Sequence, residues 1–359
     1  MPILHSGLET PNFSEDCTPA SFSTVPVLTR ALAGAALLLC LCVIVLGAYV
    51  RLSSAGLGCP DWPGCYGHLT PLGAAADAQV LSTPLAGRPL EIGKAWREML
   101  HRYAAGTLGL LILSLVLIGI FRRREGAVPP RYLMSLLAIV LAQALLGMLT
   151  VTWRLQPLVV TLHLLFGFTT LSLLLWLVLS LPTRTGAAAP AVADATAARA
   201  RPLAALGLIA LGVQIALGGW TSSNYAAMGC PDFPTCQAQW WPAGDYLAAF
   251  DLRGALTHTY EGGVLDVPVR TAIQFTHRLG ALVITVILSS AALSALRVPE
   301  KFAQRAAGLV FAALAMQLII GISMVLKGFP LWLATAHNAG AALLLMATVG
   351  LNRALRPPA

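Results

Sequence analysis

The chain has 359 residues, of which 57% are hydrophobic and only 11% are charged. A soluble domain of this length would carry about a quarter charged residues, so the composition excludes a soluble fold and indicates that the solvent is largely lipid. The apolar runs are about 20 residues long and rarely alternate, which predicts membrane-spanning helices. The net charge of +8 reflects basic residues in the segments between membrane helices and does not indicate nucleic-acid binding.

Eight apolar runs are predicted to span the membrane. They cover residues 28–50, 100–121, 132–152, 159–181, 203–223, 271–296, 307–326 and 332–352. The stretch before the first run is acidic and lacks the basic start of a signal peptide, so the first run is expected to remain as an anchored helix. Of the 23 Lys and Arg residues, 13 lie in segments on the side of the N-terminus. This bias predicts that both termini are cytoplasmic.

The chain repeats itself. Residues 46–65 read LGAYVRLSSAGLGCPDWPGC, and residues 217–236 read LGGWTSSNYAAMGCPDFPTC. The motif LHRYAAG in the second run likewise corresponds to THRLGA in the sixth, and Gln143 corresponds to Gln317. Such self-similarity predicts an all-α integral membrane protein made of two tandem four-helix bundles, related by a pseudo-twofold axis along the membrane normal.

These repeats divide the chain into five parts. A cytoplasmic N-terminal tail (1–27) precedes the first four-helix repeat (28–182). An Ala/Pro-rich cytoplasmic linker (183–202) leads to the second repeat (203–352), and a short cytoplasmic tail (353–359) ends the chain.

Four histidines lie at matching places near the outer ends of the even-numbered runs. They are His101, His163, His277 and His337. A polar side chain inside a membrane helix is costly and indicates a functional site by default, although a single histidine could simply bridge two helices. Two imidazoles from parallel helices in each half suit the axial ligation of one heme. Zinc would require more ligands in each half, and copper would lack a nearby thiolate or Met pattern. Three further histidines, His5, His68 and His258, are interpreted as solvated and non-ligating.

An arginine directly follows one proposed ligand in each half, at Arg102 and Arg278. An arginine at membrane depth needs an anion, and heme propionates offer carboxylates for bidentate pairing. The alternative is that these side chains extend to the membrane interface, and both interpretations can hold together.

The two halves differ one helical turn before these histidines. Glu98 precedes His101, whereas Gln274 occupies the matching place before His277. A carboxylate beside only one heme suggests that only the first half performs chemistry. Alternatively, Glu98 pairs with Arg97 or Lys94 or caps the start of its helix, and the spacing alone leaves both interpretations open.

Four of the seven cysteines form two pairs in the outer loops, Cys59 with Cys65 and Cys230 with Cys236. These loops face an oxidising compartment, so a disulfide within each pair is expected. A structural role is favoured for the second pair, while a redox role stays open for the first. The remaining Cys17, Cys40 and Cys42 are interpreted as free thiols.

In combination, the motif GLGCPDWPGC, the element Glu98-x-x-His101-Arg102 and the THRLG, TLH and TAHN elements resemble the heme A synthase family. The resemblance covers all eight predicted helices, and the protein looks like a bacterial member with cysteine pairs in both long outer loops. It implies an oxidoreductase of the bacterial inner membrane that converts heme O to heme A for aa3-type oxidases. In this reaction the C8 methyl group is hydroxylated twice and becomes a formyl group.

The resemblance also implies residue roles and partners. His277 and His337 would hold a resident heme b through its iron, His101 and His163 would bind the substrate heme, and Glu98 would be catalytic. Heme O synthase, an unidentified electron donor, membrane lipid and a second copy of the chain are the partners considered. The main rival is a diheme b-type electron-transfer cytochrome, which does not account for the difference between Glu98 and Gln274. A repeat-built transporter would need polar sites at the membrane midplane instead.

Overall fold

The structure is a computed structural model that describes residues 25–82, 88–121, 128–181, 195–252 and 259–356. Within these ranges every regular element is a helix, and two isolated bridges are the only strand-like pairings. Eight helices are long and apolar enough to cross a membrane. The shortest has 23 residues, which gives a length of about 34 Å and exceeds the roughly 30 Å of a bilayer core. The chain is therefore a multi-pass membrane protein, as the sequence predicts.

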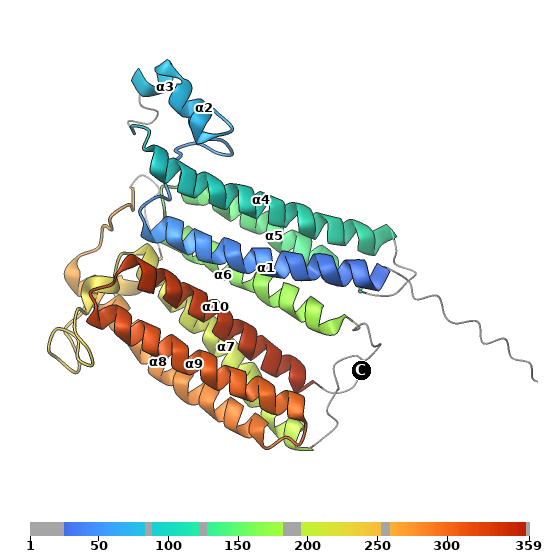
Figure 1. Cartoon of the computed structure of the whole chain (residues 1–359). Helices are drawn as coiled ribbons and strands as arrows, with labels where there is room; N and C mark the ends of the chain where they lie inside the picture. Colours follow the sequence, from blue (N-terminus) through green and yellow to red (C-terminus); the bar gives the residue numbers. More distant parts are fainter. Residues whose placement is uncertain (1–24, 83–87, 122–127, 182–194, 253–258, 357–359) are drawn as a thin grey trace, which may run out of the picture.

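The eight long helices alternate in direction along the chain. They are α1 (Val25–Leu52), α4 (Ile92–Phe121), α5 (Pro130–Thr152), α6 (Pro157–Ser180), α7 (Ala195–Ser223), α8 (Val267–Leu296), α9 (Lys301–Leu326) and α10 (Leu331–Ala354). Four short helices lie in the long loops: α2 (Pro71–Ala76), α3 (Ala78–Ser82), η3 (Ala227–Gly229) and η4 (Ala248–Phe250). The start of α1 and the end of α10 lie at one end of the molecule, and the long loops gather at the other (Figure 1).

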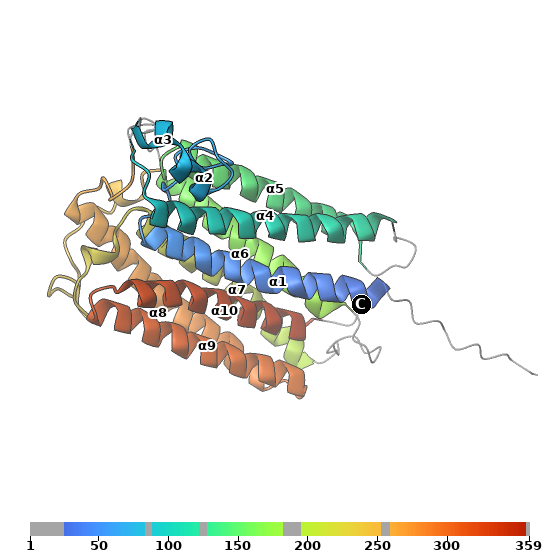
Figure 2. The same cartoon turned by 45° about the horizontal axis from the view of Figure 1, so that its top comes forward.

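The helix contacts fall into two groups of four. In the first group α1 and α5 each contact both α4 and α6, so α4 and α6 lie on opposite corners. The second group repeats this pattern, with α7 and α9 contacting both α8 and α10. Contacts of α1 and α6 with α7 and α10 join the two groups (Figures 1 and 2). The pseudo-twofold axis between them stays a prediction.

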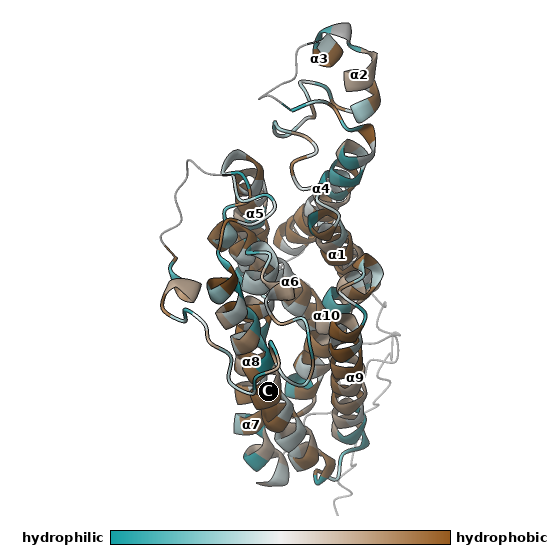
Figure 3. Cartoon of the chain, turned by 90° about the vertical axis from the view of Figure 1, so that its left-hand side faces the viewer, coloured by the Kyte–Doolittle hydropathy of each residue, from teal (hydrophilic) through white to brown (hydrophobic). Residues whose placement is uncertain are grey.

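Figure 3 looks along the helices from the end with the long loops, and it shows mainly hydrophobic helices with hydrophilic residues in the loops and at helix ends. Large side chains such as Leu110, Ile209 and Leu282 are about two-thirds exposed, as expected for residues in contact with lipid. Small residues, including Ala36 and Ala292, are fully buried and let the helices pack closely.

Three helices begin well before the predicted apolar runs, because polar helical turns extend beyond those runs. Helix α9 begins at Lys301, not at residue 307. Helix α4 begins at Ile92, not at residue 100, since Ala95 and Met99 are buried beneath the loop that carries the first cysteine pair. Helix α7 begins at Ala195 and contains Pro202, so its first turns occupy part of the predicted linker. The side chain of Arg201 holds this segment to the end of α10 by donating to the carbonyl oxygen of Leu355. The rest of the linker lies outside the described residues.

Candidate functional site

The four histidines lie in pairs on helices at opposite corners of each group. His101 is the tenth residue of α4 and His277 the eleventh of α8, which places both in the third turn because these helices begin before the predicted apolar runs. His163 and His337 are each the seventh residue of their helices, α6 and α10. Each helix begins at the end with the long loops, so the four side chains lie toward that end (Figure 1).

The second pair has the spacing that a shared metal requires. The ring centres of His277 and His337 are 6.5 Å apart, and the ring planes are inclined by 80°. A metal–imidazole bond is about 2 Å long and each ring nitrogen lies about 1 Å from its ring centre, so one metal between two imidazoles needs centres about 6 Å apart. The donor set and this distance fit axial ligation of a heme iron.

Each histidine ring lies against a glycine of a neighbouring helix. A Cβ atom added to that glycine would lie 2.8–3.2 Å from the ring carbon Cε1, in the pairs Gly47 with His101, Gly147 with His163, Gly218 with His277, and Gly321 with His337. Any larger residue would push the ring away from the bundle interior, so the glycines fix where the rings can lie. The Nδ1 atoms of three of these histidines are buried without a hydrogen-bond partner: His101, His163 and His337.

Glu98 is buried at the junction of α4 and the first cysteine loop, with 4% of its surface exposed. Its Oε2 accepts a hydrogen bond from the backbone N–H of Cys59 at 2.8 Å, and its Oε1 lies 2.6 Å from Nη2 of Arg102. Glu98 therefore pairs with Arg102. The pairing with Arg97 or Lys94 that the sequence leaves open is wrong. Two donors, one on each oxygen, therefore hold this carboxylate in a fixed position.

The matching place in the second half holds a neutral group. Gln274 is also 4% exposed, but its Oε1 has no hydrogen-bond partner. Arg278 instead donates to the carbonyl oxygens of Cys230, Asp232 and Thr235. The same helix face therefore carries an anchored carboxylate in one half and an amide with an unpaired oxygen in the other.

Both arginines hold their loops in the same way. Arg102 donates to the carbonyl oxygens of Cys59, Asp61, Pro63 and Gly64, which corresponds to the contacts that Arg278 makes. These bonds anchor the cysteine loop to the helix next to the histidine. The expected contact of both arginines with heme propionates stays a prediction.

The cysteine loops have matching structures. Disulfides join Cys59 to Cys65 and Cys230 to Cys236, each with Cα atoms 4.7 Å apart, as expected. Within the first loop, Asp61 accepts hydrogen bonds from the backbone of Tyr66 and Gly67.

In the second loop, Asp232 accepts the corresponding bonds from Gln237 and Ala238 and an additional one from the hydroxyl of Thr235. These bonds, with Thr235 the largest cause, lower the pKa of Asp232 to about 2.

Among the other residues singled out from the sequence, the structure describes His68, Cys40 and Cys42. His68 pairs with Asp77 at 3.1 Å in the first long loop, whereas His5, His258 and Cys17 lie outside the described residues. Cys40 is a buried free thiol and Cys42 an exposed one.

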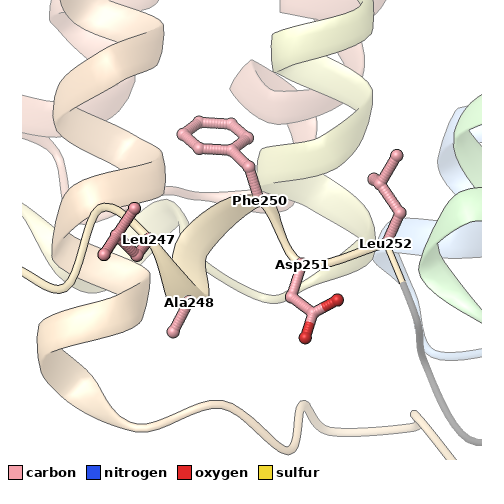
Figure 4. Close-up of a pocket in the computed structure, with 5 residues that line it drawn as sticks. All are labelled: Leu247, Ala248, Phe250, Asp251 and Leu252. Carbon is pink, nitrogen blue, oxygen red and sulfur yellow. The ribbon is translucent and has the colours of Figure 1, made fainter.

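A shallow pocket in the second long loop is lined by Leu247, Ala248, Phe250, Asp251 and Leu252 (Figure 4). None of the four histidines lines this pocket, so the pocket is separate from the candidate site.

The sequence alone predicts no role for the four glycines or for Gln214, which contacts His277. The signal for the glycines was present, because they occupy matching positions in both repeats. Gln214 gave no such signal, since Val43 occupies its matching position in the first repeat.

A family model described as cytochrome oxidase assembly protein matches residues 30–349. A heme A synthase of Shewanella oneidensis is 40% identical over 313 residues, which cover 87% of this chain and 92% of the relative. The chain belongs to the heme A synthase family.

Two further relatives carry the same name. The heme A synthase of Methylobacterium radiotolerans is 32% identical over 86% of this chain and 84% of its own length. That of Paracoccus denitrificans is 29% identical over 83% and 80%, respectively. Membership of the heme A synthase family thus extends over the whole eight-helix region, including both histidine pairs and both cysteine loops.

Proposed function

We propose that this protein is a heme A synthase that oxidises the C8 methyl group of heme O to a formyl group by two successive hydroxylations. The observation that carries this proposal is a difference between two sites whose histidines, glycines and arginines match. Glu98 brings an anchored, buried carboxylate to the first site, whereas Gln274 brings a neutral amide to the second. A pure electron carrier would have no use for this difference.

The second half is proposed to hold heme b as the resident cofactor, with His277 and His337 as its iron ligands. Their 6.5 Å ring separation and the glycines behind them support this assignment. When bound, heme b supplies a one-electron redox centre beside the first half. His101 and His163 are proposed to bind the substrate heme in the same manner, since each lies against a glycine in the matching place.

Glu98 is proposed to act on the substrate at its methyl group. Oxidation of a methyl group on a porphyrin either builds positive charge at the ring edge or releases a proton there. A carboxylate held by Cys59 N–H and by Arg102 in a pocket shielded from water can stabilise that charge or accept that proton. Gln274 lacks this capacity, so the second half would bind its heme without altering it.

The proposed setting is the bacterial inner membrane, with both termini in the cytoplasm. Heme O from a heme O synthase would be the substrate, and a separate electron donor would serve the reaction. Lipid would surround the eight helices, and the protein would associate with a second copy of itself. The product would supply aa3-type oxidases.

The test is pigment extraction from purified wild type, Glu98→Gln and the matched control Gln274→Leu. Glutamine is accommodated at the corresponding place in the second half, and its carbonyl oxygen can still accept the Cys59 N–H bond. We therefore expect Glu98→Gln to keep its fold and heme b but to accumulate heme O or the alcohol. Loss of a charged catalytic group should lower the heme A yield at least about a hundredfold. Gln274→Leu should still produce heme A.

A second measurement separates a chemical role of Glu98 from a role in anchoring the loop. The rate at which a reductant opens the Cys59–Cys65 disulfide reports how firmly the loop is held, and it should be similar in wild type and Glu98→Gln. A normal heme A yield from Glu98→Gln would contradict the proposed role of Glu98. Recovery of heme b alone from wild type, even when heme O is supplied, would favour the electron-transfer cytochrome instead.

A further inference from the structure

One of the four proposed ligands has a side-chain amide at its Nδ1 atom, which the other three lack. Nε2 of Gln214 in α7 lies 3.1 Å from Nδ1 of His277 and donates to the carbonyl oxygen of the same residue at 2.9 Å. The Nδ1 atoms of His101, His163 and His337 are all buried without a partner. Gln214 therefore restrains both the ring and the backbone of His277.

The first half lacks this contact and also the space for it. Val43 occupies the position that matches Gln214, so α1 offers no side-chain hydrogen bond to His101. Gly280 matches Ala104, and a Cβ atom at Gly280 would overlap Oε1 of Gln214. The second half thus carries the combination of Gln214 and Gly280, whereas the first half has Val43 and Ala104.

A second glutamine, Gln317, lies near this pair, but the first half also has a glutamine at the matching position. Gln317 in α9 lies 3.3 Å from Nε2 of His337 and donates to its carbonyl oxygen at 3.0 Å. The first half has Gln143 at the matching position. Of the two glutamines that contact the second pair, Gln214 is therefore the one without a counterpart in the first half.

A metal-bound imidazole usually has its second ring nitrogen hydrogen-bonded, which fixes the ring orientation and strengthens the ligand. An amide can serve Nδ1 from either end, with its nitrogen when Nδ1 is bare and its oxygen when Nδ1 carries the proton. When Nε2 binds iron, Nδ1 carries the proton, so the amide oxygen would be the acceptor. Gln214 can thus contact the ring in both states, but when its oxygen faces Nδ1 its nitrogen no longer donates to the carbonyl oxygen of His277.

We infer that Gln214 is a positioning residue that makes the second site retain its heme, and that Val43 leaves the first site able to exchange its heme. This inference rests on the proposed function, in which one heme stays and the other enters as substrate and leaves as product. It gives the two matching sites different lifetimes through one partly buried amide and the glycine that makes room for it.

The first test measures heme release from purified protein to an excess of apomyoglobin. Loss of a partner of a ligating histidine typically weakens metal binding 10- to 100-fold, so Gln214→Val should release heme b at least about tenfold faster than wild type. The midpoint potential of heme b should also rise, because His277 becomes a weaker donor without its hydrogen bond. Unchanged release and potential would overturn the inference.

The second test introduces the contact into the first half and does not require Gln214→Val to fold. The double variant Val43→Gln/Ala104→Gly should release heme O and heme A about tenfold more slowly than wild type. The single variant Val43→Gln is the matched control, because Ala104 leaves no room for the amide, and its release should resemble that of wild type. Equal release from the double variant and wild type would overturn the inference.

The readouts separate this inference from the proposed function. Chromatography distinguishes heme b from heme O and heme A, so the release of each pigment can be followed independently. Absence of heme A from wild type would contradict the proposed function, whereas the release rate and potential of heme b depend only on the second half. If only the inference fails, wild type still makes heme A, but the variants release heme at the wild-type rate.

Discussion

The two histidine sites share a scaffold and differ at a few positions beside the ligands. In both halves a glycine lies behind each histidine ring, and an arginine beside the ligand binds the carbonyl oxygens of a disulfide-closed loop. The differences lie at Glu98 and Gln274, at Val43 and Gln214, and at Ala104 and Gly280. A duplicated bundle can therefore acquire two functions without a change of fold, because only a few groups beside the ligands need to differ.

These differences are of two kinds with separable consequences. Glu98 adds a charge, which bears on what happens to a bound heme. Gln214 adds a hydrogen bond to a ligand, which bears on how long a heme stays. Variants exchanged between the halves can therefore test each consequence alone.

The largest effect is expected from removing one histidine of each half in turn. His277→Ala should lower heme b content more than about tenfold, since loss of a ligand exceeds the effect of losing a ligand's partner. His101→Ala should retain heme b but bind no heme O and produce no heme A. Pigment extraction, with the absorbance ratio of heme to protein, measures both.

This pair of variants also tests which half holds which heme. Retention of heme b by His277→Ala together with its loss from His101→Ala would show that the assignment of the halves is reversed. Equal loss of heme b from both variants would contradict a division of roles.

The sequence alone was sufficient to predict the eight spans, both disulfides and the family. Long apolar runs, paired cysteines and histidines at membrane depth each have few physical explanations. The starts of α4, α7 and α9 were missed because polar turns outside the membrane are helical only through packing, as with Met99 beneath its loop. Gln214 was missed because a single glutamine in an apolar run acquires meaning only when its distance to His277 is known.

A smaller effect is expected from filling the space behind one ring. A Cβ atom at Gly47 would lie 2.8 Å from Cε1 of His101, whereas one at Gly218 would lie 3.2 Å from Cε1 of His277. Overpacking of this kind costs about 1–3 kcal/mol, and each 1.4 kcal/mol corresponds to about tenfold in affinity. Gly47→Ala should therefore weaken heme O binding about tenfold, and Gly218→Ala should weaken heme b binding less.

Matched controls for these variants lie on the same two helices. Gly34 in α1 and Gly212 in α7 have no atom within 4 Å of an added Cβ, so alanine there should leave both affinities unchanged. Spectroscopic titration with each heme provides the measurement. A weaker effect of Gly47→Ala than of Gly218→Ala would mean that the first site adapts more readily than its geometry suggests.

The smallest effect is expected in the cysteine loops, where Thr235 in the second loop replaces Gly64 of the first. The hydrogen bonds from Thr235 and the loop backbone lower the pKa of Asp232 from its ordinary 3.8 to about 2. A lowered pKa in the folded state stabilises the loop above about pH 3.8, and this contribution is lost as the pH falls toward 2. Asp232→Asn should therefore speed reduction of Cys230–Cys236 at pH 5, by no more than about fivefold because the group is largely solvated.

A phosphine reductant that works in acid, followed by trapping of the free thiols, can measure this rate between pH 5 and pH 2.5. The difference between wild type and Asp232→Asn should be constant near pH 5 and shrink below about pH 3.8, because the wild-type carboxylate then begins to lose its advantage. Thr235→Gly, which converts this position to that of the first loop, should raise the pKa of Asp232 and move the decline to higher pH. A decline at the same pH in both proteins would show that Thr235 does not account for the difference between the loops.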